Sequence, residues 1–433
     1  MNVGNQPYAI AVNSATNHIY VANRNSNDLT IIDGDSYATT TVPVGASPDA
    51  LAVNELTNWV YVCNAEDNTV TVLDGSGNQL SSIQVGIKPV AIAINPVTNL
   101  VYVANSLSDT VTAINAATNI STEIEVGSQP VAIAFNLQTN QIYVVNSGDD
   151  SISVIDGATN AVTTVAVGDA PLAIAIDETA NQIVVADSGS NDVAILDGAS
   201  NQVFTVTTGI HPVSVAIDHN AGYIYVANSG DGRSTVIDQV SFTTQTFTAG
   251  ASPMGVVVAP RTRRVYFANL TSYGSMVVFN EDNHSSSRVA LQDRYMWPTS
   301  IAVNPLTDMV YLSDAFTNTV SVITPAEGTR GIQLVSLTYN GNFCQQNGSS
   351  GFINLYDNQD VVFQVGGGGG FQLEFQTCPF RSGCFVGAPD GMPVDVGLAA
   401  AQDGSIFYYD HLTIDGHACQ NIGPLGVRIN KGP

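Results

Sequence analysis

Short apolar runs alternate with turn signals along most of the chain. Between Pro130 and Gly168 four such runs follow one another, each closed by Asn, Asp or Gly residues. Runs of this length, rich in Val, Ile, Tyr and Thr and bounded by turn residues, are typical of β-strands. The stretch therefore predicts four short strands joined by tight turns.

This four-strand unit is present eight times. Each copy starts at a proline, and the prolines are Pro7, Pro48, Pro89, Pro130, Pro171, Pro212, Pro253 and Pro298. Successive prolines are 41 residues apart, except for the last, which follows after 45. A fixed period in this range, with four strands per period, is typical of a β-propeller. We therefore predict an all-β fold with a propeller of about eight four-stranded blades over residues 1–330, and seven blades as the alternative.

The order of the strands within a blade follows from their composition. The first strand of each unit is apolar on both faces, so we expect it to be innermost and buried between neighbouring blades. The fourth strand is rich in Thr and Val and suits an outer edge. Little sequence precedes Pro7, so the outer strand of the eighth blade is expected to come from Gly331–Leu337.

Residues 331–433 lose the period and form a second predicted domain. Four runs in this segment read as strands, namely Asp360–Val365, Phe371–Phe375, Pro393–Val396 and Ser405–Tyr409. We predict a small antiparallel β-sandwich. On its strand pattern the segment resembles an immunoglobulin-like or cupredoxin-like module.

The five cysteines are unevenly distributed. Cys63 lies in a repeat strand, where we expect a small buried apolar residue. The other four lie in the C-terminal segment, and they are Cys344, Cys378, Cys384 and Cys419. Four cysteines in a small module indicate two disulfides and an oxidising compartment. Three pairings are possible, and the spacing does not select one.

The net charge restricts the partners of the protein. It is −25 at neutral pH, and Lys88 and Lys431 are the only lysines. Nucleic acid and anionic membrane surfaces are excluded as partners, because both require basic patches. No apolar run reaches the ~18 residues that a membrane-spanning helix needs. The sequence starts within the repeat pattern, so we expect that a leader segment has been removed from its N-terminus. We therefore expect the protein to be extracellular or attached to the cell surface.

The second strand of each repeat carries a recurrent tetrapeptide. It is Tyr-Val-Ala-Asn at Tyr20, Tyr102 and Tyr225, with variants at Tyr61, Tyr143, Val184, Tyr266 and Tyr311. With the neighbouring Val-Ile-Asp-Gly and Val-Gly-x-x-Pro segments, the chain resembles the YVTN-repeat β-propellers of bacterial and archaeal surface-layer and secreted proteins. The resemblance covers about residues 1–325 and implies the fold. The motif residues themselves are expected to pack the blades and bond the turns.

Candidate binding residues lie where the repeats differ. Strands alternate in direction, so the loop before each first strand and the loop between the second and third strands must share one face, the mouth of the central channel. At these positions most repeats have Ser, Gln, Ala or Val, whereas a few have large or charged side chains. We predict a binding site at the mouth formed by Tyr8, Arg24, Asp49, Lys88, His211, Tyr295 and Trp297. A salt bridge between Lys88 and Asp49 is the structural alternative for that pair.

The sequence contains oxygen ligands that could bind calcium, but it contains no metal-binding motif. The acidic loops at Asp149–Asp150, Asn191–Asp192 and Asp231 offer oxygen ligands for calcium but lack the spacing of a calcium-binding loop. A blue-copper site needs a histidine closely after its cysteine. No histidine follows Cys419, so we predict neither copper nor any other cofactor.

Two classes of function remain open. The repeats, the acidity and the cysteines favour an extracellular binding or structural protein, possibly self-assembling, whose partner is a protein, a glycan or a small ligand. The alternative is a propeller hydrolase of the lactonase type, with Asp49, Lys88 and His211 as acid–base candidates. No catalytic motif supports the enzyme, so no catalytic residue is predicted and the binding function is preferred.

Overall fold

The computed structural model divides the chain into two compact units, Met1–Thr324 and Pro325–Pro433. It describes residues 1–324 apart from 97, 271–274 and 292–295, and beyond residue 324 it describes only the backbone of β-strands. Among the described residues, no helix is long and apolar enough to cross a membrane.

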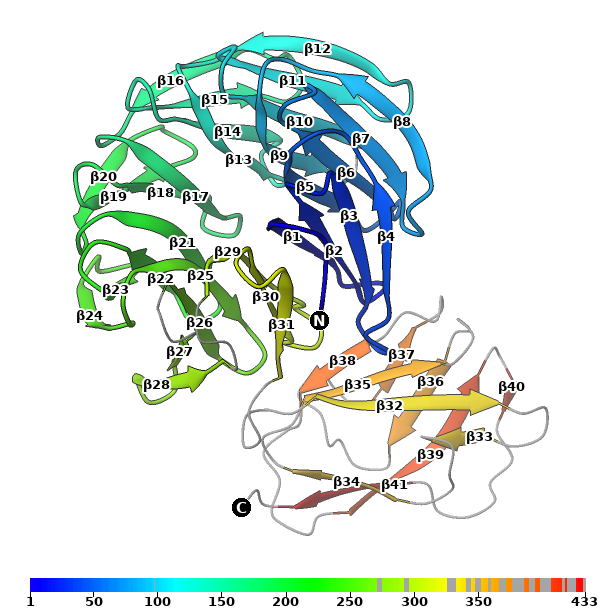
Figure 1. Cartoon of the computed structure of the whole chain (residues 1–433). Coiled ribbons are helices and arrows are strands. Elements are labelled where there is room, and N and C mark those ends of the chain that lie inside the picture. The colour runs from blue at the N-terminus through cyan, green and yellow to red at the C-terminus, as the bar shows by residue number, and fades with distance from the viewer. Residues whose placement is uncertain are drawn as a thin grey trace. The chain divides into compact units, whose positions relative to one another are not determined.

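The first unit is a β-propeller with eight blades, as predicted (Figure 1). The innermost strands are β1 Pro7–Asn13, β5 Pro48–Asn54, β9 Pro89–Asn95, β13 Pro130–Asn136, β17 Pro171–Asp177, β21 Pro212–Asp218, β25 Pro253–Ala259 and β29 Pro298–Val303. The second strands are β2 His18–Asn23, β6 Trp59–Asn64, β10 Leu100–Asn105, β14 Gln141–Asn146, β18 Gln182–Asp187, β22 Tyr223–Asn228, β26 Arg264–Asn269 and β30 Val310–Asp314. The alternative with seven blades is wrong.

The third and fourth strands complete the blades outward. The third strands are β3 Asp28–Asp33, β7 Thr69–Asp74, β11 Thr110–Asn115, β15 Ser151–Asp156, β19 Asp192–Asp197, β23 Arg233–Asp238, β27 Ser275–Asn280 and β31 Thr319–Ile323. The outer strands are β4 Thr39–Pro43, β8 Gln79–Gln84, β12 Ile120–Glu125, β16 Val162–Ala166, β20 Val203–Thr207, β24 Thr244–Thr248 and β28 Ser285–Ala290. All pairs within the blades are antiparallel. We number the blades 1 to 8 in chain order, and the eighth has only three named strands.

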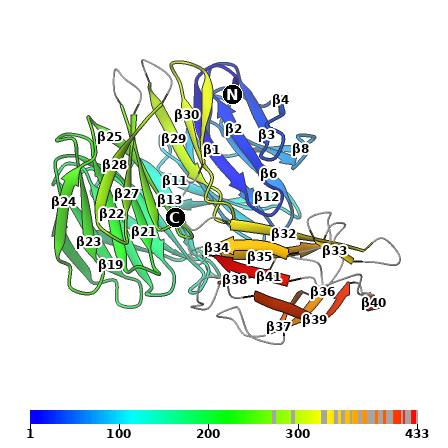
Figure 2. The ribbon, with the colours of Figure 1, turned by 90° about the horizontal axis from the view of Figure 1, so that it is seen from below.

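The N-terminus closes the ring, which corrects the expected closure. The Val320 amide donates to the Met1 carbonyl at 2.8 Å, and Val3 donates to Asn318 at 3.0 Å. Asn2 forms an isolated antiparallel bridge with Thr319, so residues 1–3 lie at the outer edge of β31 (Figure 1). β1 contacts β29 and β30, and both views show these strands side by side (Figures 1 and 2). The predicted edge strand at Gly331–Leu337 instead belongs to β32 Ile332–Tyr339, which pairs within the second unit.

The core lies between successive blades. Tyrosines of the recurrent tetrapeptide, including Tyr20, Tyr61 and Tyr143, are fully buried there, as expected for packing residues. Cys63 is also fully buried, and burial raises the pKa of its thiol. The innermost strands are less buried than predicted, because most of their central residues are only half-buried. The second strands are the most deeply buried elements.

The second unit is described by its strands alone. They are β32, β33 Cys344–Gln346, β34 Phe352–Tyr356, β35 Asp360–Val365, β36 Phe371–Phe375, β37 Phe385–Ala388, β38 Val394–Gly397, β39 Ile406–Ile414, β40 His417–Ala418 and β41 Gly426–Asn430. Two pairs, β32 with β35 and β34 with β41, are parallel, so the purely antiparallel arrangement is wrong. The sandwich and the disulfides stay predictions, because the cysteine side chains lie outside the described residues.

A belt of asparagine side chains joins the blades at the ends of the innermost strands. Each amide donates to an asparagine in the first turn of the next blade, in the pairs Asn13–Asn58, Asn54–Asn99, Asn95–Asn140, Asn136–Asn181 and Asn304–Asn17, at 2.8–3.2 Å. The accepting asparagines have a φ of 50–55°, a left-handed conformation that Asn tolerates. The pair from Asn304 to Asn17 belongs to the ring closure.

The belt also constrains the last turn of the blade. A Cβ atom on Gly34, Gly75 or Gly198 would lie within 2.6 Å of the left-handed asparagine of the same blade. Blade 6 changes both positions together, since Gly222 replaces the asparagine and Gln239 replaces the glycine. The Gln239 amide then reaches the buried carboxylate of Asp177 at 3.0 Å. Contact between blades is thus retained with different residues.

Removing one member of the belt should destabilise the propeller. Asn136→Ala deletes the side-chain hydrogen bond to Asn181. It also deletes the two hydrogen bonds that the side-chain oxygen of Asn136 accepts from the backbone amides of Gln138 and Thr139. We expect a loss of about 1–3 kcal/mol in the free energy of unfolding, measured by urea denaturation. Gln138→Ala, in the same turn, is the control. Equal stability of the two variants would contradict a structural role for the belt.

The cysteine prediction is tested by counting thiols. Denatured but unreduced protein should show one free thiol, at Cys63, because the four other cysteines are predicted to be paired. Five free thiols would overturn both the disulfides and the extracellular placement. Loss of one bridge is expected to cost roughly 2–5 kcal/mol of stability in the second unit.

Candidate functional site

The mouth face is built on one backbone arrangement that occurs in every blade. The first residue after the second strand donates its amide to the carbonyl of the residue before the proline, at 2.8–3.1 Å. The eight bonds run from Arg24 to Gln6, Ala65 to Ser47, Ser106 to Lys88, Ser147 to Gln129, Ser188 to Ala170, Ser229 to His211, Leu270 to Ser252 and Ala315 to Trp297. The two loops therefore share one face, as predicted.

The residue before the proline is held in an unusual conformation. Seven of the eight have a φ of 48–57°, and they are Gln6, Ser47, Lys88, Gln129, Ala170, His211 and Ser252. In six of these the amide donates to an Asn or Asp side chain of the preceding blade at 2.7–3.0 Å. The backbone thus fixes where each side chain leaves the surface, while the side chain itself is free to vary.

These bonds account for the acidic loops considered for calcium. Asp150 accepts from the Ala170 amide, and Asn191 accepts from the His211 amide. Asp149 accepts from Ser128, and Asp231 accepts from Ile210. Among the described residues, no group of three or more His, Cys, Asp and Glu side chains converges in the manner of a metal site.

Three of the predicted site residues form one cluster across blades 1 and 2. The Arg24 Nε atom lies 2.8 Å from the Asp49 carboxylate and 3.1 Å from the Ser47 hydroxyl. The Arg24 guanidinium also lies over the Tyr8 ring, 4.8 Å from its centre, in a cation–π contact. Asp49 is buried, and burial raises the pKa of its carboxyl although Arg24 and Ser47 oppose the shift.

Lys88 lies in blade 3 beside this cluster. Its charge favours the ionised form of Asp49, which places it within electrostatic reach. The salt bridge between them, which was the structural alternative to a binding role, is not formed, because Arg24 is the ion-pair partner of Asp49. Lys88 is exposed, and no ion pair within 4 Å is recorded for it in the described part of the chain.

Trp297 and Phe316 add two exposed aromatic side chains in blade 8, next to blade 1. They are 58% and 62% exposed, whereas Tyr8 is 37% exposed. Trp297 is anchored through its backbone, since its amide donates to Asp314 and its carbonyl accepts from Ala315. The aromatic rings, Arg24, Asp49 and Lys88 thus occupy the consecutive blades 8, 1, 2 and 3. Tyr295 lies outside the described residues.

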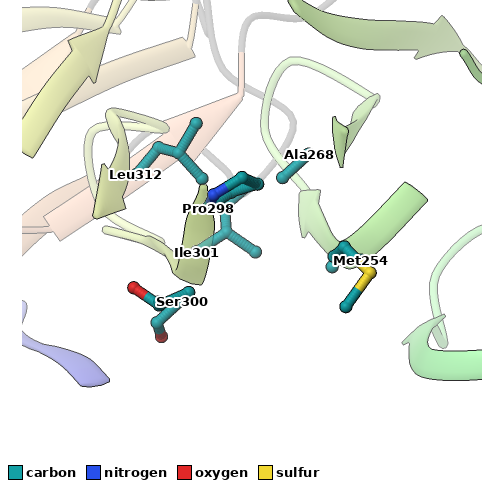
Figure 3. Close-up of a pocket in the computed structure, with 8 residues that line it drawn as sticks. Met254, Ala268, Pro298, Ser300, Ile301 and Leu312 are labelled. Atoms are coloured by element: carbon teal, nitrogen blue, oxygen red, sulfur yellow. The ribbon is translucent and has the colours of Figure 1, made fainter. Parts of the chain in front are cut away.

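A shallow cleft opens between blades 7 and 8 beside Trp297. Met254 and Ala268 line it from blade 7, and Pro298, Ile301 and Leu312 from blade 8 (Figure 3). Gly255 makes room for Ile301, whose side chain would lie 2.9 Å from a Cβ atom at that position. Its volume of about 20 Å³ leaves room for little more than a water molecule, so the cleft does not enclose a drug-sized ligand.

His211 is separated from the cluster. It lies in blade 6, and the closed ring of eight places blade 6 opposite blade 2. Its Nδ1 atom contacts the Ser188 carbonyl at 3.2 Å and the Ser188 hydroxyl at 3.5 Å. Of the three acid–base candidates of the lactonase hypothesis, Asp49 and Lys88 thus lie in neighbouring blades, and His211 lies in the blade across the ring.

Comparison with known proteins supports the fold only. No protein-family model matches the chain, and no curated protein matches it, so the YVTN-repeat resemblance stays a prediction. Hydrazine synthase of Kuenenia stuttgartiensis is similar in structure, with a TM-score of 0.52 and 19% identity over 67% of this chain and 97% of that one. The dihydro-heme d1 dehydrogenase NirN, in complex with DHE, has a TM-score of 0.56 and 14% identity over 66% of each chain.

Blade 5 carries an acidic pair that the sequence motif did not reveal as such. In most blades the last asparagine of the second strand donates to Ser or Thr hydroxyls of the third strand, as Asn64 does to Thr69 and Thr71. In blade 5 the residue is Asp187, and the facing positions are Asp192 and Ala194. Asp187 is fully buried, and burial, followed by the nearby Asp192 charge, raises its pKa to about 7.

This pair should make the stability of the propeller depend on pH. The pKa of Asp187 is higher in the folded protein than the unfolded value near ~3.9, so folding binds a proton and the free energy of unfolding falls as the pH rises from ~4 to ~7. Asp187→Asn should therefore raise Tm more at about pH 8 than at about pH 5. Thermal unfolding followed by circular dichroism measures both values.

Asp197→Asn is the matched control in the same blade. Hydrogen bonds from Ser200 lower the pKa of the Asp197 carboxyl, so this group stays ionised in both buffers. The control should shift Tm by the same amount at both pH values. An equal shift for Asp187→Asn as well would show that Asp187 does not titrate in this range.

Proposed function

We propose that this protein is a ligand-binding propeller, extracellular or attached to the cell surface, whose ligand lies on the mouth face over blades 8, 1, 2 and 3. One observation carries the proposal. The loop-to-loop hydrogen bond of the mouth is the same in all eight blades, yet Trp297, Tyr8, Arg24, Asp49 and Lys88 lie in the consecutive blades 8, 1, 2 and 3. His211 and Arg233 lie apart from them in blade 6. Packing of a blade does not require these side chains, because other repeats fill the same positions with Ser, Ala, Gln or Val.

We call the mouth face over blades 8, 1, 2 and 3 the mouth sector. Its side chains have the chemistry of a binding surface. Trp and Tyr offer a large apolar surface together with a polar atom, and Trp, Tyr and Arg are enriched among the residues that dominate binding energy. Trp297, Tyr8 and Arg24 bring these three types to adjacent blades. The opposite face is occupied mainly by the asparagine belt and its turns, whose side chains bond one another.

The extracellular or surface location rests on the acidity and on the predicted disulfides of the second unit. Self-assembly has no specific support among the described residues, so we do not propose it. We do not propose the lactonase alternative, since no contact among the described residues joins His211 to Asp49 or Lys88.

Replacement of the exposed tryptophan should weaken binding and leave the fold intact. We expect Trp297→Ala to cost at least ~1 kcal/mol of binding free energy. Ligands are first found by thermal shift of the full-length protein against soluble saccharides, peptides and organic acids, and affinities are then measured by calorimetry.

Tyr37→Ala is the matched control. Tyr37 is an aromatic residue of blade 1 with 43% exposure, but it lies in the turn between β3 and β4, on the opposite face. This variant should bind like the wild type. Equal affinities of Trp297→Ala and the wild type would show that the mouth sector is not the binding site.

A further inference from the structure

We infer that the ligand is an acidic saccharide, whose carboxylate is bound by Arg24 and Lys88 and whose sugar rings lie against Tyr8, Trp297 and Phe316. This inference rests on the proposed function and specifies the ligand class of the same site. Four features of the mouth sector support it.

The first feature is the preorganised guanidinium of Arg24. At this position other repeats have Ala65, Ser106, Ser147, Ser188, Ser229, Leu270 and Ala315. Asp49 and Ser47 engage Nε, and Tyr8 supports one face of the group. The contacts with Asp49 and Ser47 are both made by Nε, and the side chain is 32% exposed, so the guanidinium can still donate to a carboxylate at the surface. A guanidinium fixed in this way binds an anion with little loss of side-chain entropy.

The second feature is that the propeller has no structural need of the Arg24–Asp49 pair. Asp49 stands where Val90, Val131 and Val213 stand in other repeats, and those valines are half-buried, so an apolar side chain is tolerated at this position. Replacing a buried ion pair with apolar residues is often neutral or stabilising. Asp49 therefore serves to hold Arg24 in position rather than to stabilise the blade.

The third feature is a second cation, in blade 3, on the far side of Asp49 from Arg24 in blade order. Lys88 is exposed, and it stands where Gln6 and Gln129 stand in two other repeats with the same left-handed backbone. Lysine is thus not required by the conformation. Asp49 lies within electrostatic reach of both cations and of the Glu66 carboxylate, so Arg24 and Lys88 provide donors for a ligand carboxylate rather than a net positive field.

The fourth feature selects a saccharide over a peptide or an enclosed small molecule. The mouth loops bond to each other in all eight blades, so they present no free strand edge for a peptide backbone. The cleft beside Trp297 is too small to enclose a compact ligand. Exposed aromatic faces next to fixed charged donors suit instead a chain of rings that lies on the surface, contacting the apolar ring faces while the carboxylates meet Arg24 and Lys88.

The test compares two forms of one sugar chain. A short oligogalacturonate is the acidic probe, and its fully methyl-esterified form is the neutral probe of the same length and linkage. Calorimetry with the full-length protein should give an affinity about tenfold higher for the acidic form at low salt. The reason is that charge-assisted hydrogen bonds are stronger than neutral ones. The preference should shrink as the salt concentration rises, since the cations are partly exposed.

Two variants restore what other repeats have at these positions. Lys88→Gln, and the double variant Arg24→Ser with Asp49→Val, should each lower affinity for the acidic probe by about five- to tenfold. Affinity for the esterified probe and Tm should stay close to those of the wild type. Arg233→Gln removes an exposed cation from the mouth side of blade 6, and it should change neither affinity.

The outcomes separate this inference from the proposed function. The ligand class is wrong if the wild type does not prefer the acidic probe, or if Arg233→Gln lowers affinity as much as Lys88→Gln. Tighter binding of a short aspartate-rich peptide than of oligogalacturonate would overturn the saccharide. In each case the binding face is judged separately, by whether Trp297→Ala weakens whichever ligand binds while Tyr37→Ala does not.

Discussion

The mouth of this propeller depends on one hydrogen bond made eight times, from the first residue after the second strand to the carbonyl before the proline. This bond links two loops within each blade through the backbone alone. It therefore tolerates Arg24, Ser106 or Leu270 as the donor residue and Lys88, Ala170 or Trp297 as the acceptor. Because the bond is made by backbone atoms, the side chains of its donor and acceptor residues are available for recognition, which explains how neighbouring blades of near-identical structure present different chemistry.

At the face opposite the mouth, side chains rather than backbone groups make the recurring contacts between blades. Some changes there occur together, although blade 3 keeps the left-handed Asn99 with Ala116 in place of the glycine. Gly222 and Gln239 illustrate a joint change in blade 6, where loss of the left-handed asparagine coincides with loss of the glycine that it would touch. Blade 7 goes further: buried Glu281 accepts from the Tyr225 hydroxyl at 2.6 Å and lies near Arg263, and burial raises the pKa of Glu281 to about 7. These substitutions are coupled, whereas those at the mouth are largely independent.

The sequence period was sufficient to predict the blades, their number and the face shared by the two loops, because all three follow from strand alternation and repetition. It did not predict the ring closure, since residues 1–3 are too few to be identified as a strand and act through backbone bonds to β31. It also paired Asp49 with Lys88 instead of Arg24. Both cations flank the aspartate by blade order, and only the coordinates show that Arg24 reaches it. In two repeats a pair of positions differs from the other repeats at once, namely Asp187 with Ala194 and Gly222 with Gln239. An alignment of the repeats shows these pairs and would have identified the contacts that they change.

Most residues at the mouth vary between repeats without a matching change elsewhere, but Arg24 and Asp49 depend on each other. An arginine alone at that position would be a mobile surface cation, and an aspartate alone would be a buried charge without a partner, which is strongly unfavourable. The two are favourable only together, although they lie in different repeats and replace the Ser or Ala and the Val of other copies. Neither stabilises the blade better than those residues would. A coupled change of this kind, retained in a surface that otherwise varies one residue at a time, is best explained by the position it gives to the guanidinium of Arg24.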